Sequence, residues 1–439
     1  MRQQLGEDEF SDFKAAINSA PPTSIHLNPW KGSQYKNRRD HLNGVAWSDH
    51  GYYLSERPVF TIDPGFQSGG YYVQEASSMS IEQAFLSAAR LFDQPKVLDL
   101  CAAPGGKSTL ILSLLGSRGI LVSNETIRNR VDPLIHNLIK WGCANQIITC
   151  SDPERFARLE GFFDIILVDA PCSGEGLFRK DIRSRTEWND TNVHECILRQ
   201  KRILLEAIQA LAPGGFLIYS TCTYNPSENI DQLTHLKSLG LQSLSIDALE
   251  HHGFEVQKVH DCIGYQAYPH RVKGEGFFIS LLQKDQRITS QSTPPINSLD
   301  WVDIPDAVSQ VMDTSGQSVF KYHDAFYLFP TLFKDVLQRM SKMVQIVQAG
   351  TPLGMYKQKD FIPHHAVSQS IRLLPEVPSI SLDAPAALEY LKRNALFNDS
   401  GKKGYHVVRF DDQVLGWVKA IQGRLNNLYP VQYRIRGNF

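Results

Sequence analysis

The feature that most constrains the fold is an alternation of short apolar segments with longer amphipathic ones between residues 97 and 220. The short segments are rich in Val, Ile and Leu and lack polar alternation, which is typical of strands buried on both faces. Helical spacing in the stretches between them, such as 126–141 and 195–211, predicts covering helices. The pattern predicts an α/β fold with a parallel sheet, whose strands are expected at 97–100, 119–123, 146–149, 163–168 and 216–220.

Shifts in composition divide the chain into four parts. We expect an amino-terminal extension, the alternating region, a polar linker with a proline pair and a separate carboxyl-terminal region, at 1–75, 76–286, 287–299 and 300–439. The alternating region should open with a helix at 77–92 and end with an edge strand at 276–282.

Length and composition exclude several classes of protein. A chain of 439 residues should hold two to four domains. Apolar residues make up 42% and charged residues 21%, values typical of a globular protein, so global disorder is excluded. No stretch reaches the roughly 18 consecutive apolar residues that a membrane-spanning helix needs, and no membrane partner is expected.

The chain is expected to remain in the cytoplasm, because its start, MRQQLGEDEFSDF, contains no apolar signal-peptide core. Its cysteines should then be free thiols. Their number, seven, is odd and no Cys-x-x-Cys pair occurs, which argues against a disulfide framework and a structural zinc site. No metal is implied.

Charge is unevenly distributed along the chain. Residues 401–439 carry a net charge of +5, which leaves −6 for residues 1–400. Such asymmetry can mark an anionic partner, although a solvated basic face is the commoner explanation.

The first functional signal is a glycine-rich loop between an expected strand and helix. Paired glycines there let a ligand approach the backbone closely. An acid follows each of the next two strands: Glu125 is suited to ribose hydroxyls and Asp152 to an adenine ring. Singly these are weak signals, since a strand-end acid is often a helix cap. In this order they favour S-adenosylmethionine, and the loop residues are Cys101, Ala102, Ala103, Pro104, Gly105, Gly106 and Lys107.

A second signal is a pair of cysteines, Cys172 and Cys222, at the expected carboxyl ends of neighbouring strands. A thiolate beside a methyl donor suits methylation at carbon 5 of a pyrimidine, because thiol addition at carbon 6 makes carbon 5 nucleophilic. Asp169 is the candidate to protonate or hydrogen-bond ring nitrogen 3. The second cysteine is suited to remove the carbon 5 proton. Four other cysteines, Cys143, Cys150, Cys196 and Cys262, are interpreted as small buried apolar residues.

The motifs CAAPGGK, SNET, DAPCSGEG, STCTYNPSEN and YPHRVKGEGFF resemble those of the Nol/Nop/Sun family of RNA cytosine-5 methyltransferases, in particular its RsmF-type bacterial branch acting on small-subunit (16S) ribosomal RNA. The resemblance implies a Rossmann-like, class I S-adenosylmethionine-dependent methyltransferase core. It implies an α/β amino-terminal extension that binds RNA, and a carboxyl-terminal RNA-binding region with a PUA-like module at about 380–439.

The resemblance also implies roles for individual residues. Cys222 would be the nucleophile, and Cys172 would assist product release. Asp169 would serve both catalysis and the cofactor, with Lys107 close to it. The remaining residues implied around the cofactor are Cys101 to Gly106, Glu125, Arg130 and Asp152. One departure is His26, which stands where many relatives have arginine.

Three strips mix aromatic and basic residues and are candidate RNA contacts: Phe178 to Arg185, Tyr268 to Lys273, and Trp30, Tyr35, Lys36, Arg38 and Arg39. Each is equally compatible with ordinary surface. The target base must be unstacked for carbon 6 to be reached, so loops are the expected RNA target. Alternatives are the same chemistry on transfer RNA or DNA, and a largely non-catalytic ribosome-assembly factor. A monomer is expected.

Overall fold

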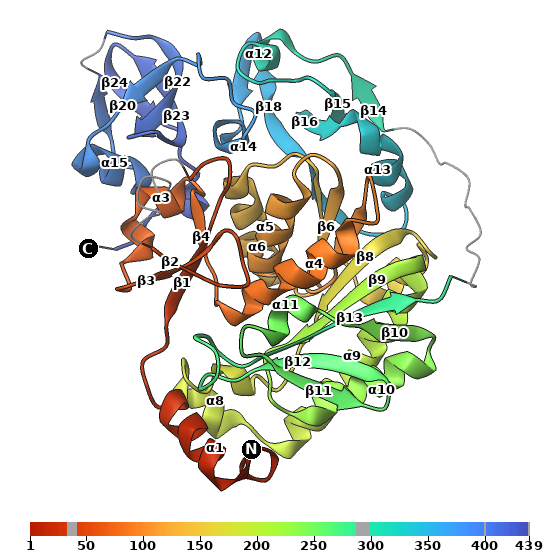
Figure 1. Ribbon diagram of the computed structural model, residues 1–439. Coiled ribbons are helices and arrows are strands. Elements are labelled where there is room, and N and C mark those ends of the chain that lie inside the picture. The colour runs from red at the N-terminus through yellow and green to blue at the C-terminus, as the bar shows by residue number, and fades with distance from the viewer. Residues whose placement is uncertain (33–41, 287–298, 399–400, 438–439) are drawn as a thin grey trace.

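The computed structural model describes residues 1–32, 42–286, 299–398 and 401–437 (Figure 1). Its centre is a twisted sheet whose first five strands run parallel in the order β7-β6-β5-β8-β9. This is the parallel sheet predicted from the apolar segments. The strands are β5 (Lys96–Asp99), β6 (Ile120–Asn124), β7 (Gln146–Thr149), β8 (Phe163–Asp169) and β9 (Leu211–Thr221).

Antiparallel strands continue the sheet beyond β9. The apolar run expected as an edge strand is β13 (Phe277–Lys284), and that expectation is wrong, because β13 lies inside the sheet. It pairs with β9 on one side and with β12 and β10 on the other, so most of its side chains are buried. The outer strands are β10 (Leu241–Leu244), β11 (Glu255–Val259) and β12 (Cys262–Ala267).

Helices cover both faces of the sheet, because alternate strand side chains enter two separate cores. Val97 points into one core and Leu98 into the other. The first core is covered by α4 (Ile81–Ala89), α5 (Gly106–Leu115) and α6 (Arg128–Trp141). The second is covered by α7 (Pro153–Ala157), α9 (Asp190–Ala210), α10 (Ile230–Ser238) and α13 (Lys334–Met340). Short elements lie between them, at η3 (Ser77–Ser80), η4 (Glu175–Leu177), α8 (Ile182–Glu187), η5 (Pro226–Glu228) and α11 (Asp247–Glu250).

The amino-terminal extension consists of a helix and a small antiparallel sheet of order β2-β3-β1-β4. Helix α1 lies beside α8, whereas the small sheet lies at the other end of a connecting segment, next to the carboxyl-terminal region (Figure 1). The elements are α1 (Arg2–Ile17), β1 (Thr23–Leu27), β2 (Asn43–Gly44), β3 (Gly51–Leu54), η2 (Phe60–Ile62), α3 (Pro64–Gln67) and β4 (Tyr71–Val73).

The carboxyl-terminal region holds two five-stranded sheets, β14-β15-β16-β18-β19 and β20-β22-β23-β24-β21. The first contains β14 (Asp300–Val302), β15 (Gln317–Tyr322), β16 (Ala325–Pro330), β18 (Thr351–Lys357) and β19 (Asp360–Pro363). The second contains β20 (Ser379–Ser381), β21 (Leu396–Asn398), β22 (Gly404–Phe410), β23 (Gln413–Ile421) and β24 (Gly423–Asn427). Helices accompany them at α12 (Asp306–Ser309), η6 (Thr331–Phe333), α14 (His365–Gln369), α15 (Ala384–Leu391) and η7 (Val431–Tyr433).

This region is not the separate body expected from the composition. Strand β17 (Ile346–Ala349) pairs antiparallel with β7 and becomes the edge of the central sheet. The pairing covers backbone groups of β7 that would otherwise form an open edge. No helix in the described part of the chain is long and apolar enough to cross a membrane.

Candidate functional site

Two thiols lie in contact at the carboxyl edge of the central sheet. Strands β8 and β9 are paired in parallel, with Asp169 opposite Ser220, so the loops that follow them leave the sheet side by side. Cys172 and Cys222 lie in these loops with their Sγ atoms 3.3 Å apart. The structure therefore brings together the two cysteines singled out in the sequence.

A lysine and an aspartate complete this cluster. Lys107, in the first turn of α5, donates to Asp169 Oδ2 at 2.7 Å. Ser220, absent from the sequence prediction, donates to the other oxygen of Asp169 at 2.8 Å. Burial alone would lower the pKa of Lys107, but Asp169 and the nearby Cys222 outweigh burial and raise it. Lys107 is therefore a fixed positive charge beside the thiols.

The two thiols differ in acidity. A hydrogen bond from Cys172 lowers the pKa of Cys222, and Lys107 adds to this effect against the opposing effects of burial and Asp169. The pKa of Cys172 is raised well above its ordinary value, chiefly because its proton is shared with Cys222 and because it is buried. Cys222 is thus the sulfur that ionises first, and the thiolate is the nucleophilic form of cysteine.

Two buried glutamates hold the cysteine loops against each other. Glu228, after Cys222, accepts hydrogen bonds from the backbone N–H and hydroxyl of Ser173. Glu175, after Cys172, accepts from the backbone N–H of Tyr224 at 3.1 Å. Sequence reasoning did not single out either glutamate. Both lie within the quoted motifs, but only the fold shows that each one reaches the opposite loop.

The glycine-rich loop follows β5 as predicted, and its shape requires glycine. Gly105 has φ +113°, a left-handed conformation that side chains disfavour. A Cβ on Gly106 would lie 3.0 Å from the ring of Tyr72, which belongs to β4. The amino-terminal extension therefore packs directly on this loop, while Asn137 of α6 donates to the carbonyl of Pro104 at 2.8 Å. Cys101 lies at the start of the loop, where burial raises the pKa of its thiol.

The two predicted nucleoside-binding acids differ in their contacts. Glu125 is fixed beside the glycine-rich loop, whereas Asp152 contacts α7 and Arg202. Glu125, only 4% exposed, accepts from the backbone N–H of Ile127 at 2.9 Å and lies 3.2 Å from the guanidinium of Arg130. Arg130 also donates to the carbonyl of Ala103, which ties the acid to the glycine-rich loop. Asp152 caps α7 and forms a 2.6 Å ion pair with Arg202.

A further acid, Asp99, lies buried beneath the loop and was not predicted. Its Oδ2 accepts a hydrogen bond from Ser108, and its Oδ1 contacts no hydrogen-bond donor among the described residues. Burial raises the pKa of Asp99 to about 7. The only sequence signal was a polar residue within the apolar segment 97–100. A glycine cradle, a strand-end carboxylate and this unpaired carboxylate oxygen fit a nucleoside cofactor that lacks phosphates.

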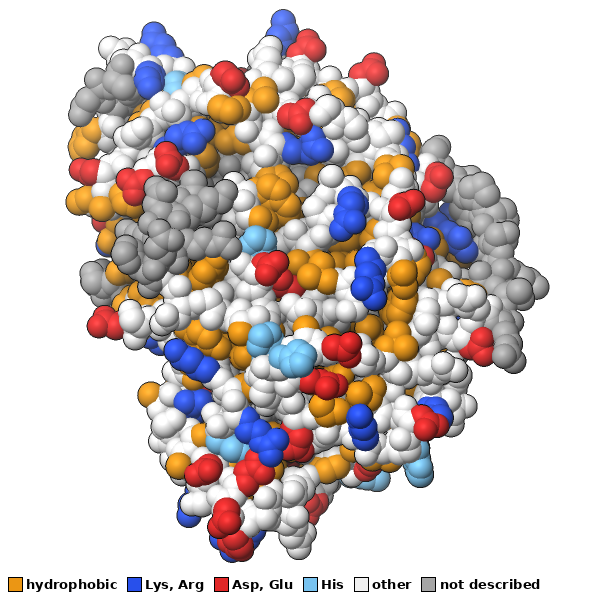
Figure 2. Space-filling model, viewed as in Figure 1, with side chains coloured by type: hydrophobic (Ala, Val, Ile, Leu, Met, Phe, Trp, Pro, Cys, Tyr) orange, Lys and Arg blue, Asp and Glu red, His pale blue; other side chains and the backbone are white. Residues whose placement is uncertain are grey.

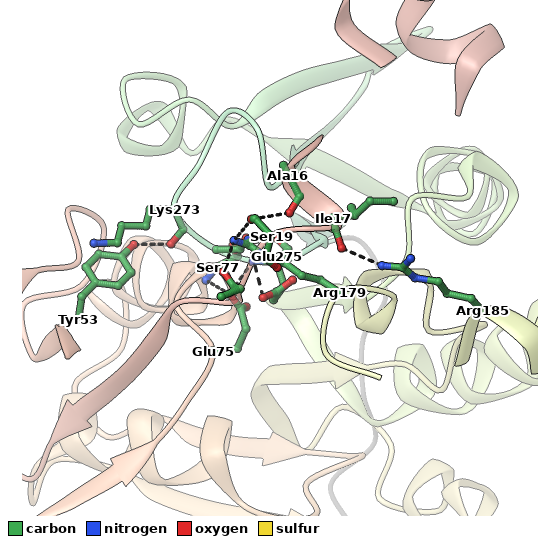
Figure 3. Close-up of polar contacts among 12 residues, drawn as sticks. Ala16, Ile17, Ser19, Tyr53, Glu75, Ser77, Arg179, Arg185, Lys273 and Glu275 are labelled. Atoms are coloured by element: carbon green, nitrogen blue, oxygen red, sulfur yellow. Dashed lines mark hydrogen bonds and ion pairs between the residues drawn. The ribbon is translucent and has the colours of Figure 1, made fainter. Parts of the chain in front are cut away.

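The candidate RNA strips are mostly occupied by internal contacts. Arg179 and Arg185 donate to backbone carbonyls of residues 17–20 (Figure 3). His270 and Arg271 both contact Glu9 of α1. In the third strip Trp30 is 40% exposed, while Tyr35, Lys36, Arg38 and Arg39 lie outside the described residues.

His26, expected at a possible RNA contact, is not exposed. It is fully buried between Tyr72 and Trp141, and burial lowers its pKa to about 3.

The fold and the site define the class of protein, a Rossmann-like methyltransferase that depends on S-adenosylmethionine. Three family models match successive parts of the chain: the N-terminal domain of 16S rRNA methyltransferase RsmF over residues 1–76, 16S rRNA methyltransferase RsmB/F over 88–283 and the methyltransferase RsmF PUA domain over 377–435. The chain belongs to the family of ribosomal RNA small subunit methyltransferase F.

Relatives with this name match most of the chain. The protein from Shewanella loihica is 30% identical and the match covers 98% of this chain and 92% of the relative. The protein from Erwinia tasmaniensis is 28% identical, with 89% and 84% covered. Among solved structures, a methyltransferase homolog from Pyrococcus horikoshii is 25% identical with a TM-score of 0.53, covering 64% of this chain and 97% of that chain. NSun6 from Pyrococcus horikoshii, solved with SFG, shares the fold at 18% identity and a TM-score of 0.52, covering 64% and 96%.

Proposed function

We propose that this chain methylates carbon 5 of a cytidine in small-subunit ribosomal RNA through a covalent adduct on Cys222. The observation that carries the proposal is the pair of thiols at 3.3 Å beside the Lys107–Asp169 ion pair. The names of the relatives support the RNA substrate. Transfer to an oxygen or an exocyclic nitrogen needs at most a base, so this arrangement favours carbon 5 of a pyrimidine.

The reaction begins with Cys222. Its thiolate adds to carbon 6 of the cytosine. Formation of the S–C6 bond shifts electron density onto carbon 5. The hydrogen bond from Cys172 and the charge of Lys107 both stabilise the thiolate in the free enzyme. These contacts support Cys222 rather than Cys172 as the nucleophile.

Asp169 is the group assigned to ring nitrogen 3. It lies at the end of β8, beside the nucleophile, where Lys107 and Ser220 fix both of its oxygens. To supply a proton or hydrogen bond at nitrogen 3, Asp169 must carry a proton in the RNA complex, and that donation stabilises the ring while carbon 6 is bonded to sulfur.

Cys172 is assigned to product release. Its Sγ lies 3.3 Å from the Sγ of Cys222, the atom that would carry the adduct. Loss of its thiol proton to solvent leaves a Cys172 thiolate that can accept the proton on carbon 5. The C–H electron pair then forms the C5–C6 double bond as the S–C6 bond breaks, and Cys222 leaves as a thiolate. The buried glutamates that join the two loops support this geometry.

S-adenosylmethionine supplies the methyl group in this family. The residues that would hold it are the loop from Cys101 to Lys107, Glu125 with Arg130, and Asp169. Asp152 remains a proposed adenine contact, although its side chain already caps α7 and pairs with Arg202.

We assign the methyltransferase domain to residues 76–286, and RNA binding to the extension 1–75 and the carboxyl-terminal region 300–439. The extension packs against the cofactor loop, and Gln413 of β23 in turn hydrogen-bonds Ser68 and Lys31 of the extension. These contacts support a role for both regions in presenting RNA to the site. We further propose a cytoplasmic monomer, which the free cysteines suit.

The test uses labelled S-adenosylmethionine with undermethylated small-subunit RNA, offered both naked and as assembled subunits. Digestion to nucleosides and mass spectrometry identify the methylated atom. Wild-type protein should yield 5-methylcytidine, Cys222→Ala should yield none, and Cys196→Ala, which removes a thiol outside the site, should retain activity. Label on another atom, or activity in Cys222→Ala, would overturn the covalent mechanism. Methylation of transfer RNA alone would overturn the ribosomal substrate.

A further inference from the structure

A groove lies between the amino-terminal extension and the Cys172 loop. One wall is the segment 20–24, which follows the end of α1 and runs into β1, and the floor is residues 73–75. Arg57 and Lys180 line the rest, and the cavity volume is about 610 Å³. Sequence reasoning did not predict this groove, because its walls come from four segments far apart in the chain.

Two arginines hold the wall in place. Arg179 donates to the carbonyl of Ala20 at 2.7 Å and to the hydroxyl of Ser19 at 2.9 Å, and Arg185 donates to the carbonyl of Ile17 at 2.7 Å (Figure 3). These bonds satisfy carbonyls at the end of α1, which otherwise lack helical partners. The groove is therefore preformed, and these two arginines serve its wall rather than a ligand.

The groove adjoins the proposed reaction site. Lys180 belongs to the same loop as Cys172, and Gly176 in that loop donates its backbone N–H to the carbonyl of Cys222 at 2.9 Å. On the floor, a Cβ on Gly106 would lie 3.7 Å from the side-chain carbon of Gln74. The groove is thus bounded by segments that also form the cofactor loop and the thiol pair.

The charge of the groove favours an anion. Glu75 lines it, but the carboxylate of Glu75 already accepts three backbone N–H bonds, from Ser77, Ser78 and Glu275. Lys180 and Arg57 are exposed and form no ion pair with a described residue. Several Lys and Arg side chains gather on the surface where α1 leads into the amino-terminal sheet (Figure 2).

A neighbouring groove of about 450 Å³ shows the contrast. It is also lined by basic residues, but His270 and Arg271 in it are already paired with Glu9, and Arg271 also with Glu255. Arg271, with two carboxylate partners, has little charge left to offer a further anion. Lys273 in the same groove forms no ion pair with a described residue, so the first groove is distinguished by carrying two such cations, Lys180 and Arg57, instead of one.

We propose that this first groove binds the single-stranded RNA segment next to the target base, with Lys180 and Arg57 contacting its phosphates. The inference rests on the proposed function, because it takes RNA as the substrate. A base whose carbon 6 is exposed must leave its helix, so the strand beside it is unpaired where it meets the site.

The experiment measures binding of a fluorescent single-stranded RNA dodecamer containing one cytidine, over a range of salt concentrations, to the full-length protein. Each variant, Lys180→Gln and Arg57→Gln, should bind about fivefold more weakly at 0.1 M salt and lower the log–log salt slope by about 0.7, the value for one single-strand phosphate. The double variant should combine both effects. Arg90→Gln is the matched control, because Arg90 is an exposed cation that forms no ion pair with a described residue and does not line the groove.

An unchanged affinity and slope in the double variant would overturn the proposal, as would an equal loss in Arg90→Gln. A double variant that loses only binding of a duplex of the same length would also overturn it. Binding is measured without methyl transfer, so absence of 5-methylcytidine from the wild-type reaction would reject the proposed function and leave this result standing.

Discussion

The loops after β8 and β9 leave the sheet side by side but present thiols of different acidity. Cys172 follows β8 by three residues and Cys222 follows β9 directly, both at the same edge of the sheet, where the two strands are paired in register. The pKa of Cys222 is nevertheless lowered while that of Cys172 is raised. The hydrogen bond from Cys172 is the main cause of the lowered pKa of Cys222, and Lys107 adds to it; Lys107 belongs to neither cysteine loop but to α5, which begins within the glycine-rich loop.

The comparison shows that a hydrogen bond between the two loops and a charge from a third segment together distinguish the two thiols. The loops are joined from both sides, since Glu228 binds Ser173 and Glu175 binds Tyr224. Their mutual contacts therefore fix where the sulfurs lie, and the charge of Lys107 favours ionisation of Cys222. Separate substitutions can test position and ionisation independently.

Among the substitutions that distinguish the roles of the two cysteine loops, replacing Cys172 should have the largest effect on turnover. In Cys172→Ala, the adduct on Cys222 can form but the carbon 5 proton has no acceptor. Turnover should fall by about 10³-fold, a typical contribution of a general base, and a covalent RNA–protein complex should accumulate on a denaturing gel. Cys196→Ala should show no complex. Normal turnover without a trapped complex would show that Cys172 is not required for release.

Removing the charge of Lys107 should narrow the difference in pKa between the thiols of Cys222 and Cys172. The pKa of Cys222 is lowered in the wild type, so its alkylation by iodoacetamide should already be rapid at a pH below the ordinary thiol range. In Lys107→Met the pKa should rise, and the midpoint of alkylation should move to higher pH. Methyl transfer should fall about 10²-fold. Peptide mass spectrometry identifies the labelled cysteine.

The control for this experiment is Lys96→Met, which removes a lysine at the opposite end of β5. Its alkylation profile should match the wild type. A profile that is unchanged in Lys107→Met as well would show that the hydrogen bond from Cys172 alone accounts for the acidity of Cys222.

The central fold could be predicted because burial on both faces leaves a direct record in the sequence. Segments such as 163–168 consist almost entirely of side chains that enter one core or the other. Polar residues just after these strands were the candidate site, and parallel strands bring such residues to one edge. Their proximity followed from topology, whereas their roles remain predictions.

Features that depend on contacts between distant segments could not be predicted. An apolar run such as 276–282 is compatible with an edge strand or an interior strand, and the sequence does not distinguish the two. Its interior place in the sheet was therefore missed. Arg179 and Arg185 look like surface cations in the sequence, yet they bond the end of α1. The burial of His26 was missed because its position in β1, beside Trp141, is set by three-dimensional packing.

The two joining glutamates should give the smallest effects and test whether the loops are held equally. Glu228→Gln alters a carboxylate that accepts from Ser173 and Gln200, whereas Glu175→Gln alters one that accepts from the backbone N–H of Tyr224. A lost hydrogen bond of about 1 kcal/mol corresponds to about a fivefold change in rate. We expect kcat to fall by about that factor in Glu228→Gln and by less in Glu175→Gln, with KM for RNA unchanged. Equal losses would show that each glutamate holds the opposite loop to the same extent, while a rise in KM alone would place their effect on RNA binding rather than on the alignment of the sulfurs.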